Sequence, residues 1–466
     1  MSVPFRTLPL VLAVSALLSA GTAAAADSLT FEAARARFHE RADIFRADAA
    51  EVERARHASE SAKSLSGPKV DITAMQVEGR KDLDLNLAIP ASVQQLGSAL
   101  SQGKLQIPSS MRFADELDLS GPRAMISATW PLYTGGAITA QQNLLEHKVR
   151  EASAAQSARL EEKDADLAMR YWGVQLARSV EELRRERLKD EEEQVHRAMR
   201  FEKKGLISRI ERMSVEVSRD AARRELVSAG TSARVAEAEL MSALREKELP
   251  ALATPLFILT GDLGTLSEWQ SRARINSPVL SRIDAQVSQA GEGVRAAESA
   301  FHPQVFAFGM KNLVKHYLTP VEPDWMVGLG IKFTLWDNRD RFSSLAASHA
   351  QEEKARAAKA EADNALASAV ETAFLRTTQA REEYLLTAST VALAKENLRL
   401  REASFAEGLS TALDVREART QMTGAQIAER AAAYKFVVSW AMLHGAAGVM
   451  PDFVATLSRP DLKRVE

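Results

Sequence analysis

The side chains that most often carry catalysis or bind metals are scattered along this chain and form none of the common motifs. Its eight histidines are dispersed, and there is no His-Glu-x-x-His pair, no Gly-x-Ser-x-Gly turn and no glycine-rich phosphate loop. Cysteine is absent, which excludes disulfides, thiolate metal sites and N-terminal lipidation of the bacterial lipoprotein kind. We therefore expect no enzyme activity, no cofactor and no metal site.

Two acidic residues stand out by their position. Glu211 lies six residues after Gly205, Asp414 lies six residues after Gly408, and a leucine follows each glycine. A charge on a long helix ordinarily marks a solvated face. Whether these two acids have a function therefore depends on the helices and turns that position them.

The two acids occupy equivalent places in an internal repeat with an offset of 203 residues. Two long stretches lack proline, from Pro131 to Pro250 and from Pro323 to Pro451. At the repeat offset the chain aligns Pro131-Leu132-Tyr133 with Thr334-Leu335-Trp336, Gly205-Leu206 with Gly408-Leu409, and Leu240 with Leu443. A repeat of this size indicates one structural unit used twice.

The sequence of each repeat predicts the same series of elements. A first helix ends at a proline, two segments of alternating apolar and polar residues follow, and then come a long helix, a Gly-Leu turn and a second long helix. The first helices are expected over residues 27–66 and 266–302, and the long ones over 138–202 and 341–406. A helix of the latter length spans roughly 100 Å. Each tip glycine permits the left-handed backbone of a tight helix end. The helix after the first turn carries a coiled-coil seam of Leu206, Ile210, Met213 and Val217, so it must pack laterally.

The alternating segments predict strands with one apolar face. Val327, Leu329, Ile331, Phe333 and Leu335 share one face, and glycines and polar residues share the other. Eleven residues separate Trp325 from Trp336, which corresponds to about 28 Å in a strand tilted by about 40°. That is the height of a lipid-facing band with aromatic edges. A half-exposed sheet on a soluble domain would show the same period.

The ends of the chain and its charge complete this organisation. Residues 1–26 are typical of a signal peptide, 27–250 form the first repeat, 251–448 the second and 449–466 a C-terminal tail. The first hairpin carries about 32 additional residues, including a possible helix over 91–105, and is expected to face outside the cell. After the predicted signal peptide, no segment reaches 18 consecutive apolar residues, so the sequence predicts no transmembrane helix. The balance of 60 basic and 62 acidic residues gives no support for nucleic-acid binding.

Together these features resemble the TolC-type outer membrane efflux family across the whole mature chain. The resemblance is carried by the segment Trp130–Gly136, the turns Phe201–Ser208 and Phe405–Thr411, the acids Glu211 and Asp414, and the doubled architecture. It implies a mainly α fold with a membrane β-barrel. Long antiparallel helical hairpins would form a trimeric α-barrel tunnel joined to a 12-stranded β-barrel, with four strands per chain.

The resemblance also implies a function. The chain would be an outer membrane channel of a Gram-negative bacterium, a passive exit duct of a tripartite efflux or type I secretion system. It would extend into the periplasm as a homotrimer in outer membrane lipid, with a periplasmic adaptor and an inner-membrane transporter as partners. The alternative is a periplasmic coiled-coil adaptor or structural protein without a barrel, but an adaptor needs one hairpin rather than two equivalent ones fed by strands.

The site residues follow from the same resemblance. Asp414 and Glu417 would form acidic rings at the periplasmic aperture. Glu211 would be linked to the residue two places after the second tip glycine, which here is Ser410 instead of a basic residue, and Arg209 and Arg416 are alternative partners. The adaptor would dock at the tip residues Gly205, Leu206, Gly408 and Leu409.

Overall fold

The computed structural model describes residues 28–102, 104, 106–118, 120–316, 322–336, 338, 340–407 and 409–465. The predicted signal peptide and Gly408 lie outside the described residues. The chain divides into two compact units. Unit 1 comprises Met1–Arg46, Arg159–Asn276 and Leu366–Glu466, and unit 2 comprises Ala47–Ala158 and Ser277–Ala365.

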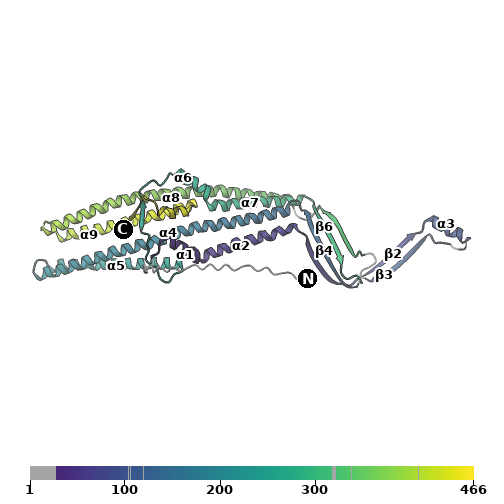
Figure 1. Ribbon diagram of the computed structural model, residues 1–466, viewed down its shortest axis with the longest axis horizontal. Helices are drawn as coiled ribbons and strands as arrows, with labels where there is room; N and C mark the ends of the chain where they lie inside the picture. The colour runs from purple at the N-terminus through teal and green to yellow at the C-terminus, as the bar shows by residue number, and fades with distance from the viewer. Residues whose placement is uncertain are drawn as a thin grey trace, which may run out of the picture. The chain divides into compact units, whose positions relative to one another are not determined.

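Four long helices dominate the structure, which confirms the predicted mainly α fold built from long helical hairpins. They are α4 (Ala137–Lys203), α5 (Arg209–Leu244), α8 (Arg341–Ala406) and α9 (Ala412–Ala447). Figure 1 shows α4 beside α5 and α8 beside α9, each pair joined by a short turn. Among the described residues, no helix is both long enough and apolar enough to cross a membrane.

The starts of the long helices are fixed by side-chain caps. The Asp340 carboxylate accepts from the Ser343 N–H at 3.0 Å at the start of α8, and the Thr134 hydroxyl accepts from the Ile138 N–H at 3.2 Å at the start of α4. At their far ends, α5 and α9 stop at left-handed residues, Arg245 and Gly448. These local contacts satisfy backbone groups that the helix ends would otherwise leave unpaired.

Each helix predicted at the start of a repeat is broken into two. The observed elements are α1 (Phe31–Arg41) and α2 (Asp43–Lys63) in the first repeat, and α6 (Leu266–Asn276) and α7 (Pro278–Glu298) in the second. Pro278 stands at the first position of α7 with Ser277 as its cap. Ala42 is extended, and on either side of it Phe38 and Phe45 meet edge to face at 5.2 Å. The prediction of unbroken helices was therefore wrong.

Unit 2 contains a four-stranded antiparallel sheet with the strand order β1-β4-β6-β7. The strands are β1 (Lys69–Val77), β4 (Gly121–Tyr133), β6 (Gln304–Asn312) and β7 (Trp325–Lys332). The predicted apolar face is present, and its side chains are exposed, with Ile72 at 71%, Leu329 at 74% and Ile331 at 76%. The strand predicted to reach Leu335 ends at Lys332, because the pairing with β6 stops there at Gln304.

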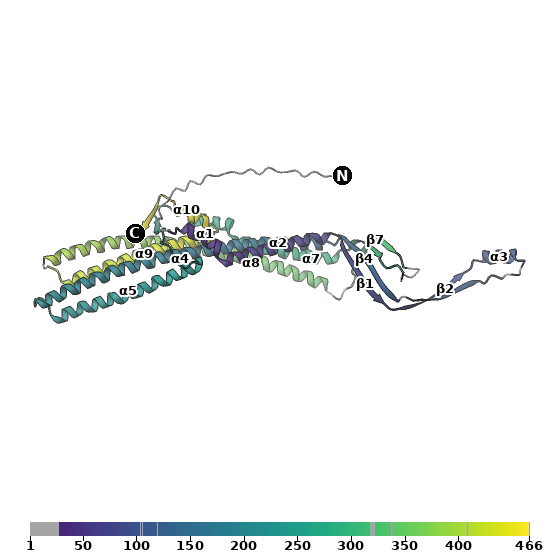
Figure 2. The ribbon, with the colours of Figure 1, turned by 60° about the horizontal axis from the view of Figure 1, so that its bottom comes forward.

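The additional residues of the first hairpin form elements of their own. They are β2 (Arg80–Ala88), α3 (Ala91–Leu100) and β3 (Ser110–Asp118). The helix is shorter than the predicted range of 91–105, and the two strands were not predicted. Among the described residues, strands β2 and β3 pair only with each other, and α3 lies at the end of this ribbon (Figure 2).

The hydrophobic core lies in unit 1, where residues from both repeats meet. Trp172 of α4 lies in a buried aromatic cluster, with its ring centroid 4.5 Å from that of Phe31 and 5.7 Å from that of Phe453. Phe453 belongs to α10 (Met450–Thr456), and the chain then pairs β8 (Leu462–Val465) with β5 (Leu256–Leu259). The C-terminal residues are thus packed onto both repeats, through Phe453 on the first and through β8 on the second.

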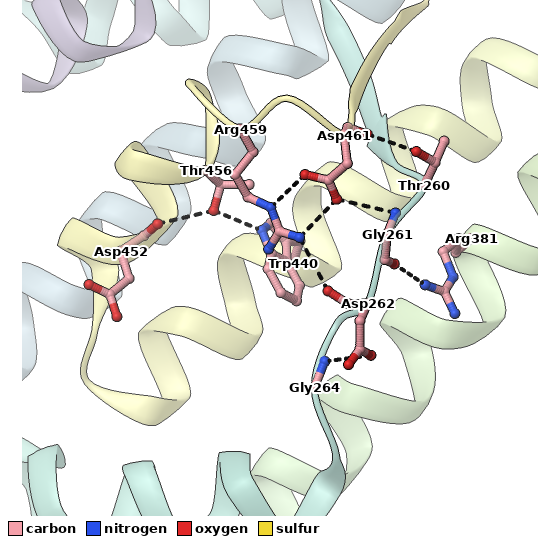
Figure 3. Close-up of polar contacts among 10 residues, drawn as sticks. All are labelled: Thr260, Gly261, Asp262, Gly264, Arg381, Trp440, Asp452, Thr456, Arg459 and Asp461. Atoms are coloured by element: carbon pink, nitrogen blue, oxygen red, sulfur yellow. Dashed lines mark hydrogen bonds and ion pairs between the residues drawn. The ribbon is translucent and has the colours of Figure 1, made fainter.

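A polar network holds the β5–β8 pair in place (Figure 3). The Arg459 guanidinium donates to both carboxylate oxygens of Asp461 at 2.8 Å and to the backbone oxygen of Asp262 at 3.2 Å. The Asp461 carboxylate also accepts from the Gly261 N–H at 3.2 Å, and the Thr260 hydroxyl donates to the Asp461 backbone oxygen at 3.0 Å. This bidentate pair and its backbone contacts anchor the C-terminal strand.

Candidate functional site at the helical tips

The first tip connects α4 to α5 through a left-handed glycine. Gly205 has a φ of 69°, and a side chain added there would meet nothing within 4 Å. The Leu206 N–H donates to the Phe201 backbone oxygen at 2.9 Å, which closes the end of the helix as in a Schellman motif. Gly205 is therefore required for backbone conformation rather than for space.

The second tip, from α8 to α9, is closed in the same way. The Leu409 N–H donates to the Ser404 backbone oxygen at 2.9 Å, which is the equivalent bond 203 residues further along the chain. Leu206 and Leu409 are both exposed, at 67% and 78%. Each hairpin thus presents an exposed leucine at its tip.

Glu211 and Asp414 have the same local role, since each completes a capping box. The Glu211 carboxylate accepts from the Ser208 N–H at 2.7 Å, and the Asp414 carboxylate accepts from the Thr411 N–H at 2.8 Å. In return the Ser208 and Thr411 hydroxyls each accept from the N–H of the acid, both at 3.2 Å. These reciprocal bonds fix the first turns of α5 and α9.

The same contacts favour the ionised forms of both acids. The pKa of Glu211 is lowered chiefly by the backbone and hydroxyl groups of Ser208. The pKa of Asp414 is lowered by the hydroxyl and backbone N–H of Thr411, then by the Ser410 hydroxyl. Both carboxylates are therefore charged at neutral pH.

The four predicted aperture residues are only partly brought together within one chain. The Ser410 hydroxyl donates to Asp414 at 3.1 Å, whereas Glu211 is engaged with Ser208 on the other hairpin. Glu417 is exposed on α9, one turn beyond Asp414. Of the two alternative partners, Arg416 donates to the Ser218 hydroxyl of α5 at 3.0 Å. The link between Glu211 and Ser410 stays a prediction.

A charged cluster between the hairpins was not found from the sequence. Arg419 of α9 pairs with Glu402 at 2.5 Å and lies 3.5 Å from Asp190 of α4. Beside it, Glu191 is only 6% exposed. Burial raises the pKa of Glu191, although Arg187, Arg416 and Arg419 oppose the shift. The cluster therefore joins the second hairpin to the first near the tips.

Unit 1 also contains a cavity of about 700 Å³ beside α6, α9 and α10. Its aromatic side chains Trp269, Trp440 and His444 are almost fully buried, and the rings of Trp440 and His444 lie 4.4 Å apart. Burial lowers the pKa of His444 to about 4, so the imidazole is neutral. In the described part of the chain, no group of three or more His, Asp or Glu side chains is arranged to hold a metal ion.

Comparisons with known proteins identify the family. The family model for the outer membrane efflux protein matches residues 34–244 and 269–449, which is well over half of the chain. The chain belongs to this family, and it is an outer membrane exit duct that works with the pump components of tripartite efflux systems. The alternative of a periplasmic adaptor without a channel is therefore not supported.

Solved structures show the same fold. The outer membrane protein VceC of Vibrio cholerae is 13% identical with a TM-score of 0.70, covering 90% of this chain and 96% of that one. The open state of the MtrE channel of Neisseria gonorrhoeae is 18% identical with a TM-score of 0.69, covering 90% and 89%. The CmeC channel of Campylobacter jejuni is 12% identical with a TM-score of 0.71, covering 92% and 89%. No curated protein matches the sequence significantly.

Proposed function

We propose that three copies of this chain assemble into one passive duct, with a 12-stranded β-barrel in outer membrane lipid and a helical tunnel in the periplasm. The sheet of unit 2 supports the barrel, because its outer strands β1 and β7 have no further strand partner among the described residues. Unpaired strand edges are not tolerated in lipid. Three sheets of four strands paired edge to edge leave no free edge.

The exposed seams of the helices support the tunnel. Ile210 and Val217 of α5 are 79% and 67% exposed, and Leu386 and Leu393 of α8 are 72% and 71% exposed. Apolar side chains at these spacings are normally buried against neighbouring helices. Lateral packing between copies would cover them.

The tips would serve as the periplasmic aperture and the docking site. Asp414 and Glu417 would ring the opening, and Glu211 and Ser410 would take part in its closed state. Gly205, Leu206, Gly408 and Leu409 would receive a periplasmic adaptor, which connects the duct to an inner-membrane transporter of an efflux or type I secretion system. Residues 27–250 and 251–448 would be the two repeats of this duct.

Cysteine cross-linking tests the assembly, since the chain contains no cysteine of its own. One cysteine is placed in β1 at Thr73 and combined in turn with one at each position of β7. Oxidation in outer membranes should give covalent trimers, and nothing larger, for the combinations that face each other across the edge. The variant with the cysteine at Thr73 alone is the control. Only monomers in every combination would refute the trimer.

A further inference from the structure

The ribbon of β2 and β3, with α3 at its end, has no covering partner among the described residues. It lies outside the four-stranded sheet of unit 2. A two-stranded ribbon is marginally stable in water unless something packs on it. Its surface therefore indicates what completes it.

One face of the ribbon is apolar. Leu85 pairs directly with Phe113, and Leu87 pairs with Met111. All four side chains are between 46% and 54% exposed. On the other face the Arg112 guanidinium makes a bidentate ion pair with Asp84, with N–O distances of 2.9 and 2.6 Å. The part of the ribbon next to α3 thus has one apolar side and one polar side.

Helix α3 extends the apolar surface. Its sequence contains no charged residue, and Val93, Leu96 and Leu100 are 46%, 62% and 79% exposed. Spacings of three and four residues place these side chains on one side of the helix. Such an accumulation of exposed apolar side chains on one small module indicates an interaction surface.

The strand register distinguishes this surface from the apolar face of the sheet. Val77 pairs with Gly121 at the end of the β1–β4 ladder, and Arg80 pairs with Asp118 at the start of the β2–β3 ladder, so two residues are omitted from each strand and the register is unchanged. The apolar residues nevertheless change from even positions, such as Ile72, to odd ones, such as Leu85. Because side chains alternate along a strand, the apolar set moves to the opposite side of the ribbon.

The charges of this module also speak against a lipid surface. Residues 80–118 contain the basic residues Arg80, Lys81, Lys104 and Arg112 and the acidic residues Asp82, Asp84, Asp115, Glu116 and Asp118. Binding to anionic headgroups requires clustered basic residues in excess. A protein partner with the same apolar surface fits better.

We propose that the apolar side of this module packs against the same module of the two other copies, so that three modules form a bundle on the threefold axis outside the membrane. The inference rests on the proposed trimer. In that trimer the even positions of β1 face lipid, so the odd positions of β2 continue the side that faces the axis. Each copy supplies an identical surface, as a cyclic interface requires. The bundle would lie across the outer mouth of the duct.

Cysteine substitutions in α3 test the bundle in the full-length protein in outer membranes. Leu96→Cys lies on the apolar side, and Ser98→Cys is the matched control, exposed on the opposite side of the same helix. Mild oxidation should convert a large share of Leu96→Cys into disulfide-linked dimers, since two of three thiols can pair. Ser98→Cys should remain unlinked.

The outcomes separate this inference from the proposed function. Heat-resistant trimers in both variants, with links only through Leu96→Cys, support the bundle. Trimers with no link, or with equal links in both variants, overturn the bundle alone, and the absence of any trimer overturns the proposed function as well. A fluorophore on Leu96→Cys that is quenched by spin-labelled lipid would show that lipid covers this surface, and it would also refute the bundle.

Discussion

At the scale of single residues, Glu211 and Asp414 occupy equivalent positions in two capping boxes, but of these two acids only Asp414 is proposed to line a ring at the aperture. Three carboxylates in a narrow aqueous opening concentrate negative potential and attract cations. We expect Asp414→Asn to lower the cation selectivity of the channel in planar bilayers and to weaken block by multivalent cations. The amount of trimer should not change.

Glu211→Gln is the matched control for that experiment. It removes the carboxylate of the equivalent capping box, so it perturbs the tip of the first hairpin as Asp414→Asn perturbs the second. Its effect on selectivity should be much smaller. Identical selectivity and block in Asp414→Asn and the parent protein would show that Asp414 acts as a helix cap only.

The half-buried Glu161 and the buried His444 of unit 1 give the free energy of unfolding opposite pH dependences. Burial raises the pKa of Glu161 from 4.5 to about 7, although it accepts from the Met450 N–H. Its contribution to the free energy of unfolding is complete below pH 4.5 and is lost as the pH rises through 7. The pKa of His444 is lowered from 6.5 to about 4, so its contribution is complete above pH 6.5 and is lost as the pH falls towards 4.

Between pH 4.5 and 6.5 these two contributions oppose each other in the parent protein. Of these two contributions, only that of His444 remains in Glu161→Gln, so this change should make the free energy of unfolding rise with pH, by up to about 1.4 kcal/mol per pH unit. In His444→Gln it should fall with pH, by less than this amount because Glu161 is only partly buried and solvent screens its charge. Unfolding of the detergent-solubilised protein across this range measures both slopes, and slopes of the same sign would contradict the prediction.

At the scale of elements, the turn from β4 into α4 depends on two glycines that differ in their surroundings. Gly135 has a φ of 66°, and a Cβ there would lie 2.7 Å from the His302 Cβ and 2.8 Å from the Ser299 oxygen. Gly136 has a φ of 92° with nothing within 4 Å. Alanine at either position costs about 1 to 2 kcal/mol of backbone strain, and only Gly135→Ala adds a clash of about 1 to 3 kcal/mol.

Gly135→Ala should therefore lower the melting temperature of the trimer more than Gly136→Ala does. Both proteins can be compared by the temperature at which the trimer band disappears on gels. An equal decrease in melting temperature for the two variants would mean that the segment containing Ser299 and His302 moves away at no cost. The turn would then not be tightly packed.

The sequence predicts the long elements well and the short ones poorly. Helix α8 was predicted within its observed bounds of Arg341–Ala406, because a long proline-free run of good helix formers has no competing conformation. Strand β5 has four residues, and its partner β8 follows about 200 residues later, so no local pattern indicates the pair. The break at Ala42 depends on the contact between Phe38 and Phe45, which exists only in the folded core.

In the candidate site too, local sequence patterns predict some residues and only the folded structure reveals others. Glu211 and Asp414 were found because each follows a Gly-Leu turn at a fixed spacing, and that spacing also places each acid in a capping box. Glu191 is one of three consecutive glutamates, and only Glu191 is buried. Which of the three glutamates is buried depends on the side of α4 that meets the arginines of α9, and the residue pattern of α4 alone does not reveal that side.

At the scale of the whole molecule, the proposed barrel places the two faces of the sheet in different solvents. Ile72 and Thr73 are neighbours in β1, both are exposed, and their side chains point to opposite faces. If Ile72 faces lipid near the bilayer midplane, Ile72→Arg should cost about 2 to 4 kcal/mol. We expect far less heat-resistant trimer in outer membranes for this variant.

Thr73→Arg controls for the size and charge of the new side chain, because it places the same group on the wet face of the same strand. It should reach the outer membrane at close to the parent level, since its guanidinium stays in water. Both variants should keep the helical content of the parent, measured by circular dichroism, because no described residue of this sheet belongs to the core of unit 1. If both arginines are tolerated equally, or if the parent protein is found in the soluble periplasmic fraction, the sheet does not face lipid and the proposed barrel is refuted.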